Sequence, residues 1–184
     1  MLALCLALGV LAAWGLPLVR VAPNRLLTGE PVFLWEILQT HGSWWVAALV
    51  LLGILGVAIT QPRKPAALAI VVVAMAASLA SLWLLAGHHA SRASLVDAAL
   101  TRTALGSGFW ALVALAWMAA LDAIARLQWA ALPRLLLQGA VFVPLLLSLG
   151  AGQDLSIAKE YANHSDVFGP AVLRHLQIVL LAVA

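Results

Sequence analysis

Charged residues are scarce in this sequence: Asp, Glu, Lys and Arg make up 9% of its 184 residues, while 65% are hydrophobic. A soluble domain carries roughly 25% charged residues, so this chain has too little polar surface to cover itself in water. Most of the polar residues fall in gaps between long apolar blocks. The composition therefore excludes a soluble globular protein and indicates an integral membrane protein.

Cysteine is nearly absent: Cys5 is the single one in the sequence. An intramolecular disulfide is therefore excluded. It lies within the first apolar block, where cysteine usually behaves as a small buried hydrophobe. The net charge of +3 comes from ten basic residues that are scattered between the apolar blocks. Without a basic face, no nucleic-acid partner is expected.

Catalytic and cofactor motifs are missing as well. The sequence has no Ser-His-Asp grouping, no Gly-rich phosphate loop and no paired-carboxylate spacing. His88 and His89 are adjacent and do not share a helical face, and neither they nor His41 have an acid or cysteine at ligand spacing. We therefore expect no enzyme, no cofactor and no metal site.

Long apolar stretches are what the chain does contain. A hydrocarbon core of about 30 Å takes roughly 20 helical residues, and a segment in lipid must satisfy its backbone hydrogen bonds internally. The pattern predicts an all-α, polytopic helical membrane protein with five full transmembrane helices plus the start of a sixth. The predicted spans are 2–19, 44–60, 66–86, 106–125 and 135–150, with the sixth beginning near Ala171.

The last apolar run, 173–184, is too short to cross a membrane, so we expect the polypeptide to continue beyond it. The first stretch has no preceding Lys or Arg and no cleavage site, so it is interpreted as a retained span rather than a signal peptide. The predicted organisation is a transmembrane region over 1–152, a polar segment over 153–170 and a new helix over 171–184.

The gaps between spans alternate in length, which places long loops on one side and short loops on the other. Basic residues are denser in the short gaps, and cytoplasmic loops are enriched in Lys and Arg. This favours a cytoplasmic N-terminus. Tryptophans near the predicted span ends support the boundaries, since indoles favour the interface; they are Trp44, Trp45, Trp110 and Trp129.

Asp122 is the one acid inside a predicted span, and an intramembrane carboxylate suggests a functional role such as ion or proton transport. Arg126 follows four residues later, so we favour an interfacial ion pair. Two small-x-x-x-small pairs in the third span predict close helix packing, unless they only reflect an alanine-rich composition. They are Ala74 with Ser78 and Ala77 with Ser81.

Prolines and caps give further local predictions. Pro17 and Pro144 lie inside predicted spans, where proline removes a backbone hydrogen bond and can kink a helix. Asp154 is predicted to cap a short helix over 155–162, and Gly169-Pro170 to begin the next one.

Three sequence stretches support a family resemblance. They are APNRL at 22–26 with TGE at 28–30, TALGSGFW at 103–110, and DLS at 154–156 leading to KEYAN at 159–163. Their order and spacing resemble the N-terminal half of bacterial YehY-type permeases for glycine betaine and related osmoprotectants. These permeases are membrane subunits of binding-protein-dependent ABC importers. The resemblance covers essentially the whole chain, and GSGFW and KEYAN are its most specific parts.

The resemblance implies a multi-pass protein of the bacterial inner membrane that transports a quaternary amine. It implies as partners an ABC ATPase subunit, a second permease subunit, a periplasmic substrate-binding protein and membrane lipid. The family's transport core begins after a segment similar to VLRHLQ at 172–177. Its coupling loop for the ATPase lies beyond this chain.

The resemblance also implies a cytoplasmic N-terminus and a periplasmic segment 153–168. Candidate contacts with the binding protein are Asp154, Lys159, Glu160, Tyr161 and Asn163. A second hypothesis stays open, in which the chain is a stand-alone helical membrane scaffold or assembly protein without transport activity.

Overall fold

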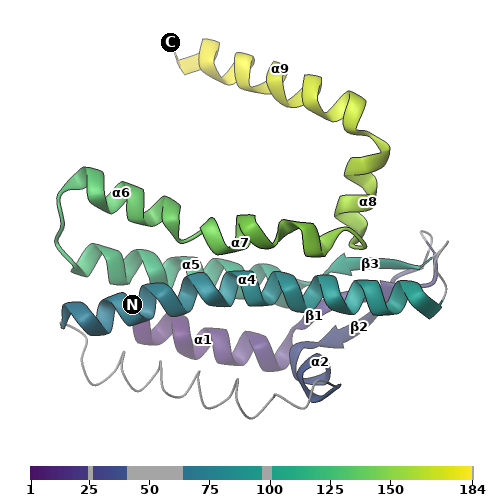
Figure 1. Ribbon diagram of the computed structural model, residues 1–184, viewed down its shortest axis with the longest axis horizontal. Coiled ribbons are helices and arrows are strands. Elements are labelled where there is room, and N and C mark those ends of the chain that lie inside the picture. The colour runs from purple at the N-terminus through teal and green to yellow at the C-terminus, as the bar shows by residue number, and fades with distance from the viewer. Residues whose placement is uncertain (25–26, 41–63, 97–100, 184) are drawn as a thin grey trace.

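The computed structural model of the chain describes residues 1–24, 27–40, 64–96 and 101–183. Long helices lie side by side, a small sheet occupies one end of the bundle, and the C-terminal helix stands apart (Figure 1). Three described segments are long and apolar enough to cross a membrane: Pro65–Leu95, Ser107–Arg126 and Ala131–Gly152. The predicted span 44–60, with Trp44 and Trp45, lies outside the described residues.

The first predicted span is shorter than expected. Helix α1 covers Leu2–Gly15, and Leu16 then adopts an extended backbone with φ −117° and ψ 139°. The residue before a proline avoids the α region, so Pro17 ends the helix one residue early and begins a strand instead. The predicted helix over 2–19 was therefore wrong in its last four residues.

A three-stranded antiparallel sheet corrects the all-α prediction. Strand β1 (Pro17–Ala22) lies between β2 (Glu30–Phe33) and β3 (Arg102–Leu105), in the order β2-β1-β3. These strands fall at the ends of apolar blocks or in the gaps between them, and each is too short to show a sustained alternation. The chain is thus a mostly helical membrane protein with a small sheet. Helix α2 (Leu34–Thr40) follows β2 directly.

Helix α4 spans Pro65–Val96, which is 32 residues and about 48 Å at 1.5 Å per residue. The predicted span ended at Ala86, and residues 87–105 were expected to form a loop. That prediction was wrong for its first ten residues. Gly87 is a weak interruption, and the stretch after it has no proline to stop the helix.

Helix α5 covers Ser107–Arg126, close to the predicted 106–125. The predicted span 135–150 is instead broken into α6 (Ala131–Ala140), α7 (Val143–Ser148) and a 3₁₀ turn, η1 (Leu149–Gly152). Pro144 lies in the first turn of α7, where its missing N–H cannot bond back to the preceding turn. The kink expected at this proline is therefore present as a helix break.

The segment after η1 forms two helices, α8 (Ser156–Asn163) and α9 (Ser165–Val183). Two predictions need correction here. Asp154 does not cap α8: Leu155 occupies the N-cap position and no side chain caps the helix. Gly169-Pro170 lies inside α9 rather than at its start. Pro170 is the sixth residue of α9, beyond the first four amides that have no helical acceptor, so it leaves the Asp166 carbonyl without a helical donor.

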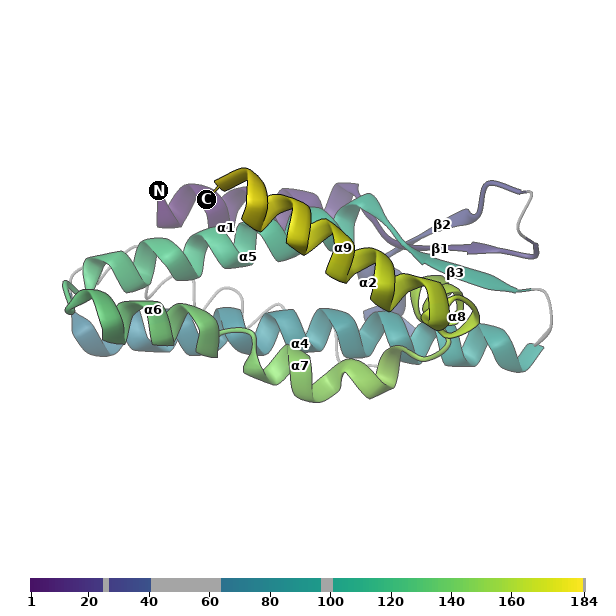
Figure 2. The ribbon, with the colours of Figure 1, turned by 90° about the horizontal axis from the view of Figure 1, so that it is seen from above.

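The core forms where α4 and α1 pack on α5, and Figure 2 shows α4 and α5 running side by side along the bundle. A row of alanines on α5 lets the neighbouring helices approach closely; it consists of Ala116, Ala119, Ala120 and Ala123. A second cluster joins the helices to the sheet, with Leu18, Val19, Phe109 and Leu155 nearly inaccessible to solvent. The sheet is thus anchored to the helices by its own apolar residues.

Candidate binding surface at the polar end of the bundle

The sheet, the C-terminal part of α4 and helix α8 lie together, and we call this region the polar end (Figure 1). It forms because α5 begins immediately after β3. The Gly106 amide donates a hydrogen bond of 2.8 Å to the Leu18 carbonyl, which joins the start of α5 to β1. A Cβ on Gly108 would lie 2.6 Å from the Leu16 oxygen. The glycines of the GSGFW motif therefore allow the start of α5 to lie directly against the backbone of residues 16–18.

Helix α8 docks on the sheet through the residue that precedes it. Leu155 forms a parallel bridge with Thr103 of β3, and both are almost completely buried at 0% and 1% exposure. The helix therefore starts from a fixed point on the sheet.

Polar side chains then connect α8 to the end of α4. Ser91 Oγ donates a hydrogen bond of 2.8 Å to Asp154 Oδ2. Lys159 Nζ lies 3.7 Å from Asp154 Oδ1 and 3.4 Å from Ser94 Oγ. Asp154 and Lys159, both predicted partner contacts, thus have partners within the chain.

The other predicted contacts differ in their surroundings. Glu160 lies 3.9 Å from Arg102 on β3 and 3.8 Å from His164, with its side chain 44% exposed. Tyr161 is 57% exposed and packs edge-on against Phe168 of α9 at 5.4 Å between ring centroids. Asn163 is exposed at the end of α8. The structure brings all five predicted residues to one helix and its approach.

A pocket of ≈ 480 Å³ opens between α8 and the start of β3. Its polar lining includes residues that sequence reasoning missed, Thr101, Arg102 and Gln153, beside the predicted Lys159 and Asn163. Ser91 and Ser94 were also missed. Their only sequence signal is a pair of hydroxyls three residues apart where the apolar block ends.

Helix α4 and η1 cross and pack closely against each other next to the polar end. A Cβ on Gly87 would collide with the Ala151 carbonyl, and a Cβ on Gly152 would collide with the Trp83 ring. The Trp83 indole N–H donates a hydrogen bond of 3.3 Å to the Leu149 carbonyl. The two glycines therefore set how closely α4 and η1 approach.

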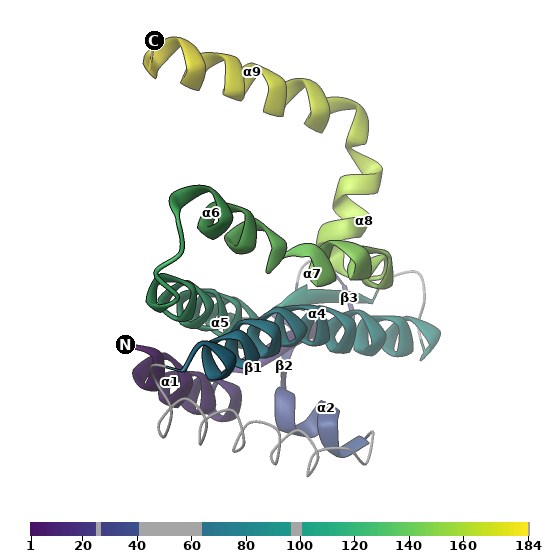
Figure 3. The same ribbon diagram turned by 60° about the vertical axis from the view of Figure 1, so that its left-hand side comes forward.

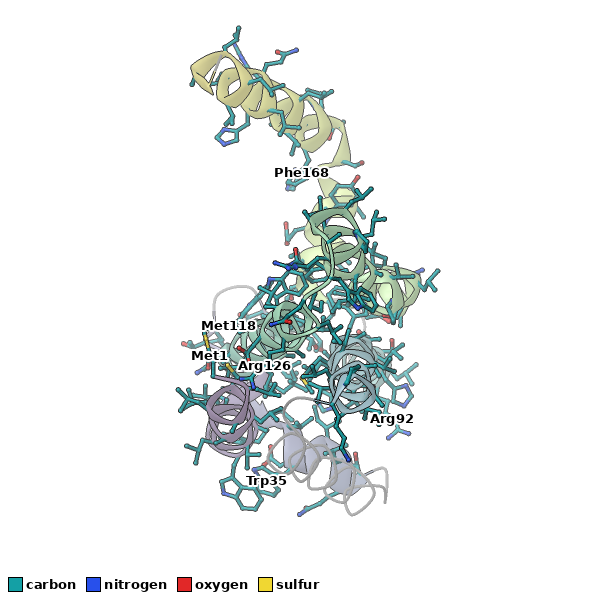
Figure 4. All side chains as sticks on the ribbon, turned by 90° about the vertical axis from the view of Figure 1, so that its left-hand side faces the viewer. Met1, Trp35, Arg92, Met118, Arg126 and Phe168 are labelled. Atoms are coloured by element: carbon teal, nitrogen blue, oxygen red, sulfur yellow. The ribbon has the colours of Figure 1, made fainter. Side chains whose placement is uncertain are left out.

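The predicted ion pair lies at the opposite end of α5. Arg126 donates to Asp122 Oδ2 from Nε at 3.0 Å and from a terminal nitrogen at 2.8 Å. The same oxygen accepts a hydrogen bond of 3.0 Å from the Leu2 amide, a partner that the sequence did not suggest. Figure 4 shows Met1 and Arg126 close together at this end. Asp122 therefore joins the start of α1 to the end of α5.

The predicted packing residues share one helix, α4, but differ in exposure. Ala74 and Ser78 are partly buried, and Ser78 Oγ donates to the Ala74 carbonyl at 2.8 Å, whereas Ala77 and Ser81 are exposed. Their role in helix packing stays a prediction. Among the described residues, no group of three His, Cys, Asp or Glu side chains is placed to hold a metal ion.

Comparison with known proteins gives one clear match. Residues 1–158 match the protein family described as "ABC transporter permease YehY, N-terminal domain". No curated protein and no solved structure matches the chain. The family and the apolar helices indicate a multi-pass inner-membrane protein that is a transporter component rather than an enzyme. Permeases of this class work with an ATPase and a binding protein. The chain belongs to the family of YehY-type ABC transporter permeases, of which it carries the N-terminal domain.

Proposed function

We propose that this chain is the N-terminal part of the permease subunit of an ABC importer for glycine betaine or a related osmoprotectant. The observation that carries the proposal is the family match over residues 1–158. ATP hydrolysis belongs to a separate subunit, since neither a phosphate-binding loop nor a catalytic grouping occurs in the sequence. In this proposal, five transmembrane spans precede the transport core of the subunit. The complex also contains a second permease subunit.

We further propose that the N-terminus is cytoplasmic and that the polar end faces the periplasm. Residues 1–152 then form the membrane region, 153–170 the periplasmic segment and 171–184 the start of the permease core. The denser basic residues of the short gaps support this orientation.

The periplasmic binding protein docks on α8 in this proposal. Supporting it, Tyr161 and Asn163 are exposed while Asp154 and Lys159 connect the helix to α4, so α8 presents side chains from a fixed position. A preformed surface loses little conformational entropy when a partner binds. Arg102 and Lys159 beside the ≈ 480 Å³ pocket offer cationic partners for carboxylates on the binding protein.

Binding-protein-stimulated uptake of glycine betaine, measured with the complete importer in proteoliposomes, tests the proposal. Charge reversal at Lys159 and Glu160 is expected to weaken the stimulation, and Asn163→Lys is expected to weaken it without breaking a contact between α8 and α4. Arg92→Gln is the matched control, because Arg92 is exposed on α4 outside both pockets at the polar end (Figure 4).

Unchanged stimulation in the Asn163 and Lys159/Glu160 variants would remove the docking surface. An importer that retains full uptake and stimulation when this chain is deleted from its subunit would favour the scaffold hypothesis instead.

A further inference from the structure

A second pocket at the polar end, of ≈ 260 Å³, lies on the sheet side of α8. Two arginines line it, Arg20 from β1 and Arg102 from β3. The strand register places Arg20 opposite Ala104 and Arg102 opposite Ala22. Directly opposed residues lie on the same face of an antiparallel sheet, so both arginines share one face. Each faces a small alanine, which leaves room beside the guanidinium groups.

Some hydrogen-bond donors that line this pocket have no acceptor among the described residues. Ser156 Oγ is buried and has no hydrogen-bond partner among the described residues. The Arg102 guanidinium lies 3.9 Å from Glu160, beyond hydrogen-bond distance. Arg20 donates one bond of 3.3 Å to the Gly29 carbonyl and retains its other N–H groups. A buried hydroxyl without a partner is costly, so a ligand with acceptor oxygens fits this position.

Charge narrows the choice of ligand. Arg20 and Arg102 supply two positive charges and Glu160 one negative charge, which leaves a net charge of +1 among the described lining residues. Arginine favours phosphate and carboxylate because its fork of N–H groups matches their oxygens. A phosphodiester carries one negative charge and complements this pocket.

The position of the pocket along the bundle favours a lipid headgroup as the source of the phosphodiester. Helix α5 is 20 residues, about 30 Å, which equals the hydrocarbon thickness. Ala104, the partner of Arg20, precedes the start of α5 by three residues, about 10 Å at the rise of a strand. Long arginine side chains reach from such a position into the headgroup layer. Lipid phosphates are concentrated there.

We propose that Arg20, Arg102 and Ser156 form a binding site for the phosphodiester of a phospholipid headgroup. The two guanidinium groups bind the phosphate oxygens, and Ser156 Oγ donates a hydrogen bond to one of them. This site shares Arg102 with the docking surface proposed on α8, whereas Arg20 and Ser156 line the second pocket and not the first. Its test measures lipid binding and needs neither the binding protein nor transport.

Native mass spectrometry of the full chain in detergent, titrated with phosphatidylglycerol, tests the site. Arg20→Gln and Arg102→Gln are each expected to weaken binding of the tightest lipid about tenfold, since each removes charge-assisted hydrogen bonds. Ser156→Ala is expected to weaken binding of the same lipid without lowering the melting temperature, because its hydroxyl has no hydrogen-bond partner among the described residues. Arg92→Gln removes one charge from the same end and is expected to leave binding unchanged.

Three outcomes would overturn the proposal. In the first, Arg92→Gln weakens binding as much as Arg102→Gln, so that general charge explains the affinity. In the second, lipid binding is unchanged in both pocket arginine variants. In the third, millimolar inorganic phosphate displaces the lipid from the wild-type chain, which would make free phosphate the ligand.

Discussion

At the scale of single residues, Gly106 and Gly108 explain why GSGFW is a distinctive stretch. The start of α5 lies directly on the backbone that connects α1 to β1, and a side chain at position 108 would lie 2.6 Å from the Leu16 oxygen and 2.8 Å from the Pro17 oxygen. Backbone oxygens cannot move aside as a flexible side chain can. The motif therefore preserves a close contact between two segments that are far apart in the sequence.

Gly108→Ala is expected to destabilise the protein by about 1–3 kcal/mol, the usual cost of overpacking. Gly9→Ala is the matched control, because a Cβ at Gly9 meets nothing within 4 Å and the residue lies inside α1. An alanine there is expected to stabilise the helix by about 0.5–1 kcal/mol. Thermal unfolding of both variants in detergent checks the prediction, and equal melting temperatures would contradict it.

Asp122 is a second residue whose contacts define its role. One of its oxygens accepts from Arg126 and from the Leu2 amide, and its side chain is 21% exposed. Asp122→Asn removes the charge from both interactions, so we expect a loss of about 1–2 kcal/mol. Arg126→Gln keeps the bond to Leu2 and is expected to cost less.

Denaturation of these two variants in detergent, followed by circular dichroism, compares their stabilities. The reverse order of stability would contradict the assigned role. Abolished ion flux in Asp122→Asn, at unchanged stability, would support the carrier interpretation of this carboxylate instead.

At the scale of elements, the crossing of α4 with η1 depends on two glycines. Gly152→Ala is expected to push η1 away from the Trp83 ring and to lower stability by about 1–3 kcal/mol. Gly150→Ala is the control two residues away, where a Cβ meets nothing within 4 Å. The intrinsic tryptophan fluorescence, to which Trp83 is one of eight contributors, and the melting temperature should both change in the first variant only. If Gly152→Ala and Gly150→Ala change the fluorescence and the melting temperature alike, contact with the Trp83 ring does not explain the effect.

Sequence reasoning predicted some elements well and missed others for physical reasons. The ends of α5 were predicted to within one residue, because Gly106 precedes it and Arg126 ends its apolar block. The sheet was missed because β1 is stabilised by pairing with β3, which lies some 80 residues along the chain. Local patterns contain no information about such a partner.

The candidate site shows the same division. KEYAN was correctly expected to lie in a short helix, and all five predicted residues lie on α8 or at its approach. The residues that hold this helix in place, Ser91, Ser94 and Arg102, could not be identified from sequence. They are separated from it by more than 50 residues, and single serines or arginines in a loop are common.

At the scale of the whole molecule, the proposed topology can be tested by chemical labelling. Asn163 and Gln128 are both exposed and lie beyond opposite ends of α5. In a Cys5→Ser background, Asn163→Cys is expected to react with a membrane-impermeant maleimide from the periplasm, while Gln128→Cys reacts only after the membrane is permeabilised. The reverse result would invert the proposed orientation. Reaction of both in intact cells would mean that α5 does not cross the membrane.

In the part of the chain that the structure describes, helix α9 joins the other helices near His164, and residues 165–182 are exposed along its length (Figure 3). Its 19 residues make a rod of about 28 Å. By simple geometry, a rotation of about 10° at the joint would displace the far end by about 5 Å, roughly one helical turn. A small change of angle at the His164 joint would therefore become a displacement of about one helical turn at the C-terminal end of α9, while α8 keeps its place on the sheet.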